Sequence, residues 1–433
     1  MAELKHIRGA VLSFSAPPDP VSMHGVHYLQ DAVVTISGQQ ITDVCAVESF
    51  VNSGGKLDQV HDVRPGLILP GFVDTHIHYP QMNIIGSYGR QLMDWLENYA
   101  FPAELAFASI EYAQQQAQVF MQRLLECGTT TALTFTTVHP HATDALFNAA
   151  AAINARMIAG KVLMNRNAPD DLLDQDDGQV QNEALLEKWH GHGRLAYAIT
   201  PRFAITCTQQ QLQAAGELVA RHPDVYVHSH IAEHPDEIAA TMALFPEAAD
   251  YTDVYARHGL LTDHAVFAHG IHLSDTEMQR FASAGASIAF CPSSNLFLGS
   301  GLLELERLQS FGVGMGVGSD VGGGTSFSLL STLGDGYKVS QLNNHSWHPL
   351  QAFYAITTGG AEVLHLQDRI GRIEAGYEAD IVVLAPAPGS MLEQRVEAAT
   401  SLDETLFAYM WLGADHGVAE TYVAGVRQFV RQV

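Results

Sequence analysis

Two spacings of apolar residues follow each other along the chain. In about the first sixty residues and again after about residue 366, apolar and polar residues alternate in short segments separated by turn residues, which is typical of half-buried β-strands. Between about residues 69 and 365, short apolar runs alternate with stretches whose apolar residues recur at intervals of three and four, which is typical of helices. The pattern predicts a β-domain built from both ends of the chain and a central α/β domain.

Eight apolar segments of the central region are predicted strands: residues 69–78, 129–135, 156–164, 194–202, 225–230, 265–270, 287–292 and 313–320. Eight strands that alternate with helices favour a (β/α)8 TIM barrel, although an open doubly wound sheet would show a similar alternation. We therefore expect an α/β fold with a catalytic barrel at residues 69–365. A flanking β-sandwich domain is expected to combine residues 1–68 and 366–433.

Composition narrows the class of protein. There are 22 Lys and Arg residues against 47 Asp and Glu residues, and the resulting net charge of −25 disfavours binding to nucleic acid or to an anionic membrane. No run of apolar residues is long enough to span a membrane, and the first residues lack the apolar segment of a secretory signal. The four cysteines are widely spaced and form no CxxC motif, which suits a reducing cytoplasm and excludes thiolate zinc modules. We expect a cytoplasmic protein.

Histidine is unusually frequent, with 22 residues, and it is the commonest metal ligand in proteins. Four His-x-His pairs occur: His76/His78, His139/His141, His190/His192 and His228/His230. Because residues two apart in a strand face the same side, such a pair can bind a metal where a strand ends in a site. The second pair is expected in a loop beyond its strand, and the third pair at the opposite end of the barrel. Spacing alone therefore does not identify the ligands.

Position at strand ends does identify a candidate metal site. His76 and His78 end the first barrel strand, His230 ends the fifth, and Asp320 ends the eighth. The active site of a (β/α)8 barrel lies at the C-terminal ends of its strands. Three imidazoles and one carboxylate are a ligand set that suits zinc or another borderline divalent ion.

Two further residues are candidates for proton transfer. Glu233 follows His230 by three residues, and His269 ends the sixth strand. A carboxylate beside a metal site can shuttle protons, and an imidazole can hydrogen-bond the attacking hydroxide. The segment from His230 to His234 also matches the HxxEH motif of inverzincin metallopeptidases, but that motif needs both histidines on one helix. Here it begins on a strand and is followed at once by Pro235.

Glycines occupy alternate positions before Asp320, at Gly312, Gly314, Gly316 and Gly318. They share a face of the predicted strand with the carboxylate, so we expect that face to carry no side chains and to leave the floor of the pocket open. The glycines do not match the GxGxxG motif of dinucleotide-binding loops in any register.

Several longer strings carry a resemblance to known proteins. The segments at residues 69–78, 230–233, 267–270, 318–320 and 371–384 resemble the amidohydrolase superfamily over nearly the whole chain. More specific strings are similar to the bacterial guanine deaminase family; they lie at residues 78–81, 86–104, 161–174, 200–204, 289–301 and 318–327. The resemblance implies a (β/α)8 barrel flanked by a β-sandwich, and the hydrolysis of guanine to xanthine and ammonia in guanine catabolism. It also implies a homodimer.

The resemblance assigns roles to the candidate residues. It implies one Zn²⁺ per chain, bound by a ligand set comprising His76, His78, His230 and Asp320. Glu233 corresponds to the proton shuttle, and His269 corresponds to the residue that stabilises the attacking hydroxide. Asp320 would also accept a proton from the attacking water.

The same resemblance implies a set of substrate contacts. Arg202 would bind the C6 carbonyl oxygen of guanine, Gln81 the hydrogen-bonding edge of the ring, and Phe203 would stack on the ring. The ring would also contact four residues named above: His78, His230, Glu233 and Asp320. Guanine and water are therefore the expected partners, and no nucleic acid or membrane is expected to bind.

The sequence favours one metal over two, and it leaves alternatives for the substrate and the reaction. Binuclear relatives place a carbamylated lysine at the end of the fourth strand, where this chain has Thr200, Pro201 and Arg202, so a single metal is expected. The HxE…PCxxC signature of the other zinc deaminase fold is absent from the sequence. Three alternatives stay open: a deaminase of another aminated ring such as 8-oxoguanine or an s-triazine, a cyclic-amide hydrolase of the same superfamily, and a scaffold without activity.

Overall fold

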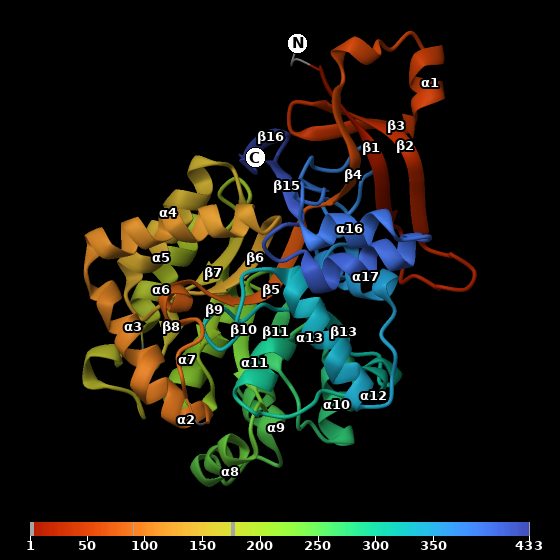
Figure 1. The fold of residues 1–433 in the computed structure, drawn as a ribbon. Coiled ribbons are helices and arrows are strands. Elements are labelled where there is room, and N and C mark those ends of the chain that lie inside the picture. Colours follow the sequence, from red (N-terminus) through yellow and green to blue (C-terminus); the bar gives the residue numbers. More distant parts are fainter. Residues whose placement is uncertain (1–3, 90, 175–177, 433) are drawn as a thin grey trace.

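The computed structural model describes residues 4–89, 91–174 and 178–432. In these residues the strands form two β-sheets (Figure 1). Strands near both ends of the chain form one sheet, and strands from the middle of the chain form the other. The terminal sheet lies at one end of the molecule and the barrel at the other, with both chain termini beside the terminal sheet (Figure 1). The predicted fold class, an α/β barrel with a flanking β-domain from both termini, is confirmed.

The terminal sheet has seven strands in the order β16-β15-β14-β4-β1-β2-β3. It is mixed, because β1 pairs with β2 antiparallel and with β4 parallel. The C-terminal strand β14 pairs with the N-terminal strand β4, so neither end of the chain completes the sheet alone. The strands are β1 (Leu4–Phe14), β2 (Val26–Ser37), β3 (Gln40–Ala46), β4 (His61–Pro70), β14 (Ile381–Leu384), β15 (Val418–Val423) and β16 (Val426–Val430).

The barrel sheet has nine strands in the described residues: eight follow one another in the order β5-β6-β7-β9-β10-β11-β12-β13, and the short β8 pairs with β9. Every pairing among them is parallel, so all their C-terminal ends lie at one end of the barrel. The strands are β5 (Phe72–His78), β6 (Thr129–Phe135), β7 (Arg156–Gly160), β8 (Val162–Leu163), β9 (Leu195–Pro201), β10 (Tyr226–Ile231), β11 (Ala265–His269), β12 (Ser287–Phe290) and β13 (Gly314–Val317).

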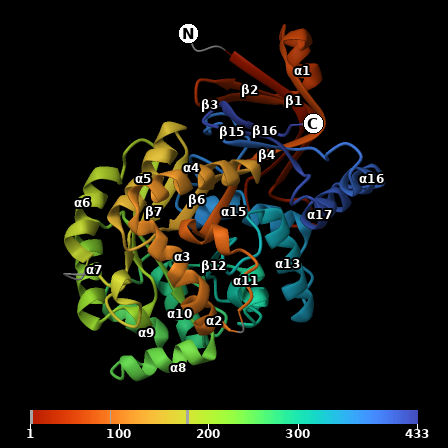
Figure 2. The same cartoon turned by 60° about the vertical axis from the view of Figure 1, so that its left-hand side comes forward.

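Helices surround the barrel strands (Figure 2). α4 illustrates why these segments are helical: it buries apolar residues at intervals of three and four, and Ser109 caps its N-terminus by accepting from the backbone N–H of Tyr112. The helices around the barrel are α4 (Ile110–Glu126), α5 (Pro140–Ala152), α6 (Gln179–Trp189), α7 (Gln209–Arg221), α8 (Pro235–Leu244), α9 (Tyr251–Arg257), α10 (Asp275–Ala284), α11 (Pro292–Phe297), α12 (Leu305–Ser310) and α13 (Leu329–Leu342). No helix of the described segments could cross a membrane.

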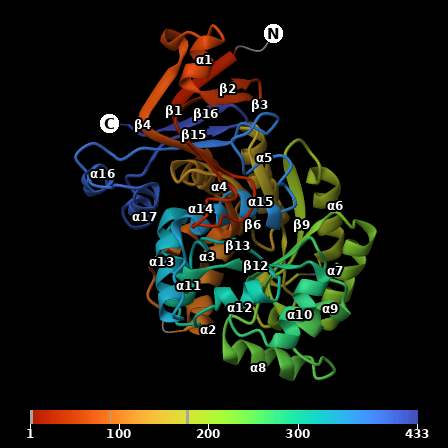
Figure 3. The ribbon, with the colours of Figure 1, turned by 90° about the vertical axis from the view of Figure 1, so that its right-hand side faces the viewer.

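Some helices mark the two ends of the molecule. α2 and α8 lie at the end of the barrel farthest from the terminal sheet, whereas α16 and α17 lie beside that sheet (Figures 1 and 3). The remaining α-helices are α1 (Val47–Asn52), α2 (Leu92–Trp95), α3 (Phe101–Leu105), α14 (Pro349–Ala355), α15 (Thr358–Val363), α16 (Met391–Glu397) and α17 (Leu402–Leu412).

The segment 69–78, predicted as one strand, is divided between the two sheets. β4 ends at Pro70 in the terminal sheet, and β5 begins at Phe72 in the barrel. Gly71 lies between them, and a Cβ at this position would be 2.2 Å from Thr130 Oγ1. The absence of a side chain therefore lets the chain pass closely against β6 as it enters the barrel.

The glycines of β13 do not leave an open pocket floor, so that expectation was wrong. A Cβ at Gly316 would be 2.3 Å from Thr75 Cγ2, and a Cβ at Gly318 would be 2.7 Å from His76 Cβ. The backbone N–H of Asp320 donates to the carbonyl oxygen of His76 at 2.9 Å. The space beside Gly316 and Gly318 is occupied by β5, and the small size of these two glycines allows β13 and the segment after it to approach β5 and complete the barrel.

Candidate active site

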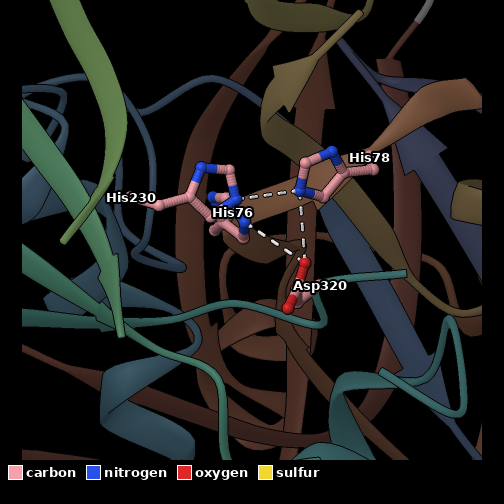
Figure 4. A group of neighbouring side chains, drawn as sticks. All are labelled: His76, His78, His230 and Asp320. Atoms are coloured by element: carbon pink, nitrogen blue, oxygen red, sulfur yellow. Dashed lines mark hydrogen bonds and ion pairs between the residues drawn. The ribbon is translucent and has the colours of Figure 1, made fainter. Parts of the chain in front are cut away.

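The four predicted ligands converge at the C-terminal ends of the barrel strands (Figure 4). His76 and His78 come from β5, His230 from β10, and Asp320 from the segment after β13. The Nε2 atoms of His76 and His78 lie 3.2 Å and 3.3 Å from Asp320 Oδ1. The Nε2 atoms of His78 and His230 are 3.2 Å apart. One ligand atom from each of the four residues lies within 4.8 Å of all the others.

The chemistry of this cluster fits a divalent cation. Burial lowers the pKa of His76, His78 and His230 well below the usual 6.5, so the imidazoles are neutral and carry free lone pairs. His76 Nε2 is buried and has no hydrogen-bond partner in the described part of the chain. Lone pairs that converge without protons between them are repulsive unless a cation lies among them. Three imidazole nitrogens and one carboxylate oxygen are donors that zinc binds.

Hydrogen bonds aim two of the imidazoles at the cluster. His76 Nδ1 lies 2.8 Å from His228 Nε2, and His230 Nδ1 lies 2.7 Å from the backbone oxygen of Arg202. Each bond occupies Nδ1 and turns Nε2 toward Asp320. His228 lies on the same face of β10 as His230, two residues before it. Strand alternation alone does not show whether His228 contacts a ligand residue or only packs in the core, whereas the structure places it against His76.

A second group of ligand types lies next to the first. Ligand atoms of His269, Cys291 and Asp320 also lie within 4.8 Å of one another. Burial, the largest cause, raises the pKa of the Cys291 thiol well above its usual value, and Asp320 adds to the shift. The protonated thiol that this favours is a poor metal ligand, so the three-histidine cluster is the better cation site.

Three residues of the site have left-handed backbone conformations. The φ angles are 49° at Ala232, 72° at His269 and 48° at Asp320, a region that residues other than glycine seldom adopt. Each of them lies where a barrel strand ends and the chain turns. Strained backbone of this kind is found where the surrounding structure holds a side chain in a functional position.

Glu233 and His269 lie side by side at the cluster. β10 and β11 pair with Ile231 opposite His269, which brings the ends of the two strands to the same level. Glu233 Oε2 is 3.4 Å from His269 Nε2, and Glu233 Oε1 accepts a hydrogen bond from Ser300 Oγ at 2.9 Å. His269 Nδ1 lies 2.8 Å from Asn295 Oδ1, so it donates to that oxygen and presents Nε2 to the site.

The electrostatics of Glu233 suit proton transfer. Its carboxyl group is buried, and burial followed by repulsion from Asp320 raises its pKa to about 8. The hydrogen bond from Ser300 opposes this shift. At neutral pH Glu233 can therefore carry a proton and also release it, which is the property required of a group that both donates and accepts protons.

One pocket contains all the expected substrate contacts. Its empty volume, including the part open to solvent, is about 420 Å³. The predicted contacts in its lining are His78, Gln81, Arg202, Phe203, His230, Glu233 and Asp320. Apolar walls that the sequence did not indicate come from Leu92, Trp95, Leu96 and Leu298. The polar groups thus face a largely apolar cavity.

Arg202 and Gln81 share a partner that the sequence did not reveal. Arg202 Nη1 donates to both oxygens of Glu104, at 2.6 Å and 2.8 Å. Gln81 Nε2 donates to Glu104 Oε1 at 3.1 Å. Glu104 lies within the segment 86–104 noted for its resemblance, but no spacing rule links it to either partner.

The His139/His141 and His190/His192 pairs do not line this pocket. His141 Nε2 contacts the backbone oxygen of Phe107, and His190 contacts Asp224 and the backbone of Tyr197. His234 precedes and caps α8, whereas His230 belongs to β10. The two histidines of the peptidase-like motif therefore do not share a helix, as that motif would require.

The chain is similar to known proteins over most of its length. The model of the Amidohydrolase family matches residues 67–426. Guanine deaminase from Escherichia coli is 43% identical over 426 residues, which cover 98% of this chain and 97% of that protein. The solved structure of E. coli guanine deaminase has a TM-score of 0.95 at 42% identity and covers 100% of both chains.

A guanine deaminase from C. acetobutylicum, solved with guanine bound in its active site, has a TM-score of 0.89 at 26% identity. The match covers 99% of this chain and 100% of that one. The similarity in sequence and in structure therefore extends over the barrel and the terminal sheet together. The chain belongs to the amidohydrolase family and, within it, to the guanine deaminases.

Proposed function

We propose that this protein deaminates guanine by hydrolysis and yields xanthine and ammonia. One observation carries the proposal: a single pocket is lined by three of the four cluster residues, by the protonatable Glu233 and by the polar side chains of Arg202 and Gln81. The similarity to guanine deaminases over the full chain supports the same reaction.

We propose that one Zn²⁺ per chain is bound by His76, His78, His230 and Asp320. A zinc ion supplies a nucleophile at neutral pH, since it lowers the pKa of water from about 15.7 to about 7. The neutral imidazoles and the unpartnered Nε2 of His76 support this assignment. Iron and other divalent ions also accept such donors, so the identity of the native metal needs direct measurement.

The proposed proton transfers use three side chains. Asp320 accepts a proton from the attacking water. His269, whose Nε2 lies 3.9 Å from Asp320 Oδ2, holds the hydroxide by a hydrogen bond as it attacks C2 of guanine. Glu233 gives its proton to the ring nitrogen on which electron density accumulates. It then takes up the proton of the hydroxyl group added at C2 and delivers it to the departing amine, so that the C2–N bond breaks, the C2 carbonyl forms and ammonia leaves. The proton held by Asp320 then restores Glu233. The pKa of about 8 matches both of these steps for Glu233.

The proposed substrate contacts explain selectivity for guanine. Arg202 donates to the C6 carbonyl oxygen, Gln81 contacts the polar edge of the ring, and Phe203 stacks on its face. Adenine has no C6 carbonyl, so it would leave the buried Arg202 without a ligand partner. A polar site rejects a ligand that leaves its groups unpaired, and this discriminates more strongly than shape does.

An ammonia-release assay tests the proposed function. The purified protein is incubated with guanine before and after chelation, and its metal content is measured on the same samples. Guanine-dependent ammonia and xanthine that disappear with zinc and return with it are expected. Metal-loaded protein that leaves guanine unchanged would overturn the proposal. Release of ammonia from 8-oxoguanine or an s-triazine instead, or opening of a cyclic amide without ammonia, would favour the corresponding alternative.

We also propose a cytoplasmic homodimer with two domains. The cysteines at positions 45, 127, 207 and 291 are free, which suits a reducing compartment. Residues 1–68 and 366–433 would form the β-domain, and residues 69–365 the barrel domain. Light scattering measures the oligomeric state, and a monomer at micromolar concentration would contradict the dimer.

A further inference from the structure

Glu104 is a buried charge that the proposed chemistry does not use. It lies in α3 with its side chain fully buried. Arg202 Nη1 donates to both of its oxygens, and Gln81 Nε2 donates to one of them. A single carboxylate therefore contacts both polar side chains proposed to bind the purine, although it does not itself line the pocket.

Glu104 balances the charge of Arg202. The Arg202 side chain is only 3% exposed, and its guanidinium carbon lies 5.4 Å from the centre of the Phe101 ring. A buried guanidinium without a counter-charge would be strongly destabilising. In the described residues the side-chain hydrogen bonds of Arg202 all leave from Nη1, so Nη2 and Nε are available as donors to a ligand. The ion pair thus offers donors to the pocket without net charge.

Glu104 also orients Gln81. A carboxylate oxygen only accepts hydrogen bonds, so the Gln81 amide must turn its NH2 group toward Glu104. Gln81 Oε1 then lies against Gly322, where a Cβ would come within 2.3 Å of it. The wall of the pocket consequently presents N–H donors from Arg202 and a carbonyl acceptor from Gln81. This pair complements a ring edge on which a carbonyl oxygen is next to an N–H group, as in the C6 carbonyl and N1–H of guanine.

We propose that Glu104 is a positioning residue that sets ligand specificity through Arg202 and Gln81: it selects neutral rings with a carbonyl next to an N–H and rejects anionic rings. The inference rests on the proposed function, because that function places the purine against this wall. Without the carboxylate, Arg202 is left unpaired in the pocket. An anionic ring then becomes the ligand that neutralises it.

Two purine probes test this specificity by direct binding. Hypoxanthine is neutral at pH 7, carries the carbonyl and N–H edge, and has no 2-amino group to lose; urate is an anion at the same pH. Calorimetric titration of the metal-loaded wild type and of Glu104→Gln gives the Kd of each probe. In the variant we expect weaker hypoxanthine binding and tighter urate binding. The ratio of the two Kd values should change about tenfold or more, the effect of one hydrogen bond to a charged group.

Three further variants separate positioning from a general loss of structure. Glu104→Asp keeps the charge and should largely restore the wild-type ratio. Glu378→Gln removes another buried carboxylate that pairs with arginines, far from the pocket lining, and should leave the ratio unchanged. Glu104→Gln in an Arg202→Met background leaves no buried charge unpaired. If Glu104 acts on anionic rings through Arg202, the Glu104→Gln substitution should tighten urate binding less in this background than in the wild type, and the remaining change in hypoxanthine binding reports the contact with Gln81.

Kinetics supply a readout that a purely structural role would not move. For guanine, Glu104→Gln should raise KM about tenfold or more, while kcat changes less than about threefold, since the catalytic groups keep their positions. An unchanged Kd ratio in folded Glu104→Gln, or an equal change in Glu378→Gln, would overturn the proposal. Because the probes report binding without turnover, wild type that binds hypoxanthine selectively but does not deaminate guanine would contradict the proposed function and leave the role of Glu104 supported.

Discussion

The two ends of the barrel bury charged groups in opposite ways. At the end that faces the terminal sheet, Arg156 Nη2 donates to both oxygens of Glu378, at 2.7 Å and 2.6 Å, and Arg194 pairs with Asp380 and Glu378. Burial alone would raise the pKa of Glu378, but Arg194 and Arg156 outweigh it and the pKa is lowered. At the other end burial and repulsion from Asp320 raise the pKa of Glu233 to about 8.

The difference indicates that the buried charges at the N-terminal end of the barrel stabilise the fold, whereas those at the C-terminal end serve the reaction. Charges at the N-terminal ends of the strands are compensated by partners from the terminal sheet, and they join the two parts of the molecule. At the C-terminal ends, Glu233 and Asp320 are held by hydrogen bonds and backbone turns, and their ion pairs in the described residues are with histidines rather than with arginine or lysine. An uncompensated group retains its capacity to exchange a proton, bind a cation or bind a substrate. Substitutions at the C-terminal end should therefore lower activity or binding, whereas substitutions at the N-terminal end should lower the free energy of unfolding.

The largest effect is expected at Glu233. Glu233→Gln keeps the shape of the side chain but removes the exchangeable proton, so kcat for guanine should fall by about 10²–10⁴-fold. Stopped ammonia-release assays measure the rate, and elemental analysis should show unchanged zinc content. A near-normal kcat would show that the unpaired carboxyl group of this end is not the proton shuttle.

Arg202 should affect binding more than turnover. Arg202→Ala removes the donors to the carbonyl oxygen of guanine, and it also leaves Glu104 as an unpaired buried carboxylate. We expect KM to rise about 10–100-fold with a smaller change in kcat, the size of one or two hydrogen bonds to a charged group. Steady-state kinetics measure both constants. Unchanged constants would refute the contact.

At the catalytic end, His228 should affect the affinity for zinc. His228→Phe removes the partner of His76 Nδ1 but keeps an aromatic ring of similar size. Loss of such an outer contact should weaken zinc binding about 10–100-fold. Competition with a chromophoric chelator measures the affinity, and substitution of His192, outside the pocket lining, serves as the control. Equal affinities in all three proteins would mean that the contact with His228 does not orient His76.

The smallest effect is expected at the opposite end. Glu378→Gln weakens the ion pairs with Arg156 and Arg194, and it should lower the free energy of unfolding by about 1.5–3 kcal/mol while kcat and KM stay unchanged. The lowered pKa of Glu378 means that its ionised form stabilises the fold above its unfolded pKa of about 4.5, and this contribution is lost as the pH falls further.

Denaturant titrations of Glu378→Gln and wild type between pH 3 and pH 7 test this difference. The variant should lose less stability than wild type on acidification, because it has no carboxylate to protonate at this position. A variant with impaired kcat at neutral pH would show that the two ends of the barrel are not independent.

The residues alone were enough to predict the barrel and to bring together the candidate metal ligands. His76, His78, His230 and Asp320 were found because a strand alternates with a period of two and because parallel barrel strands all end on the same side. Both rules are local, so they need only the run of apolar residues before each ligand. The eight barrel strands followed from the same local signal, and the family resemblance added the substrate contacts.

Contacts between segments far apart in sequence could not be predicted, and only the tertiary structure showed them. Glu104 is 98 positions from Arg202, and Asn295 is 26 positions from His269. The glycines of β13 were misjudged for the same reason, since their role depends on β5 beside them. Such pairings arise from how helices and strands pack across the barrel, and packing between distant segments leaves no periodic trace in either segment.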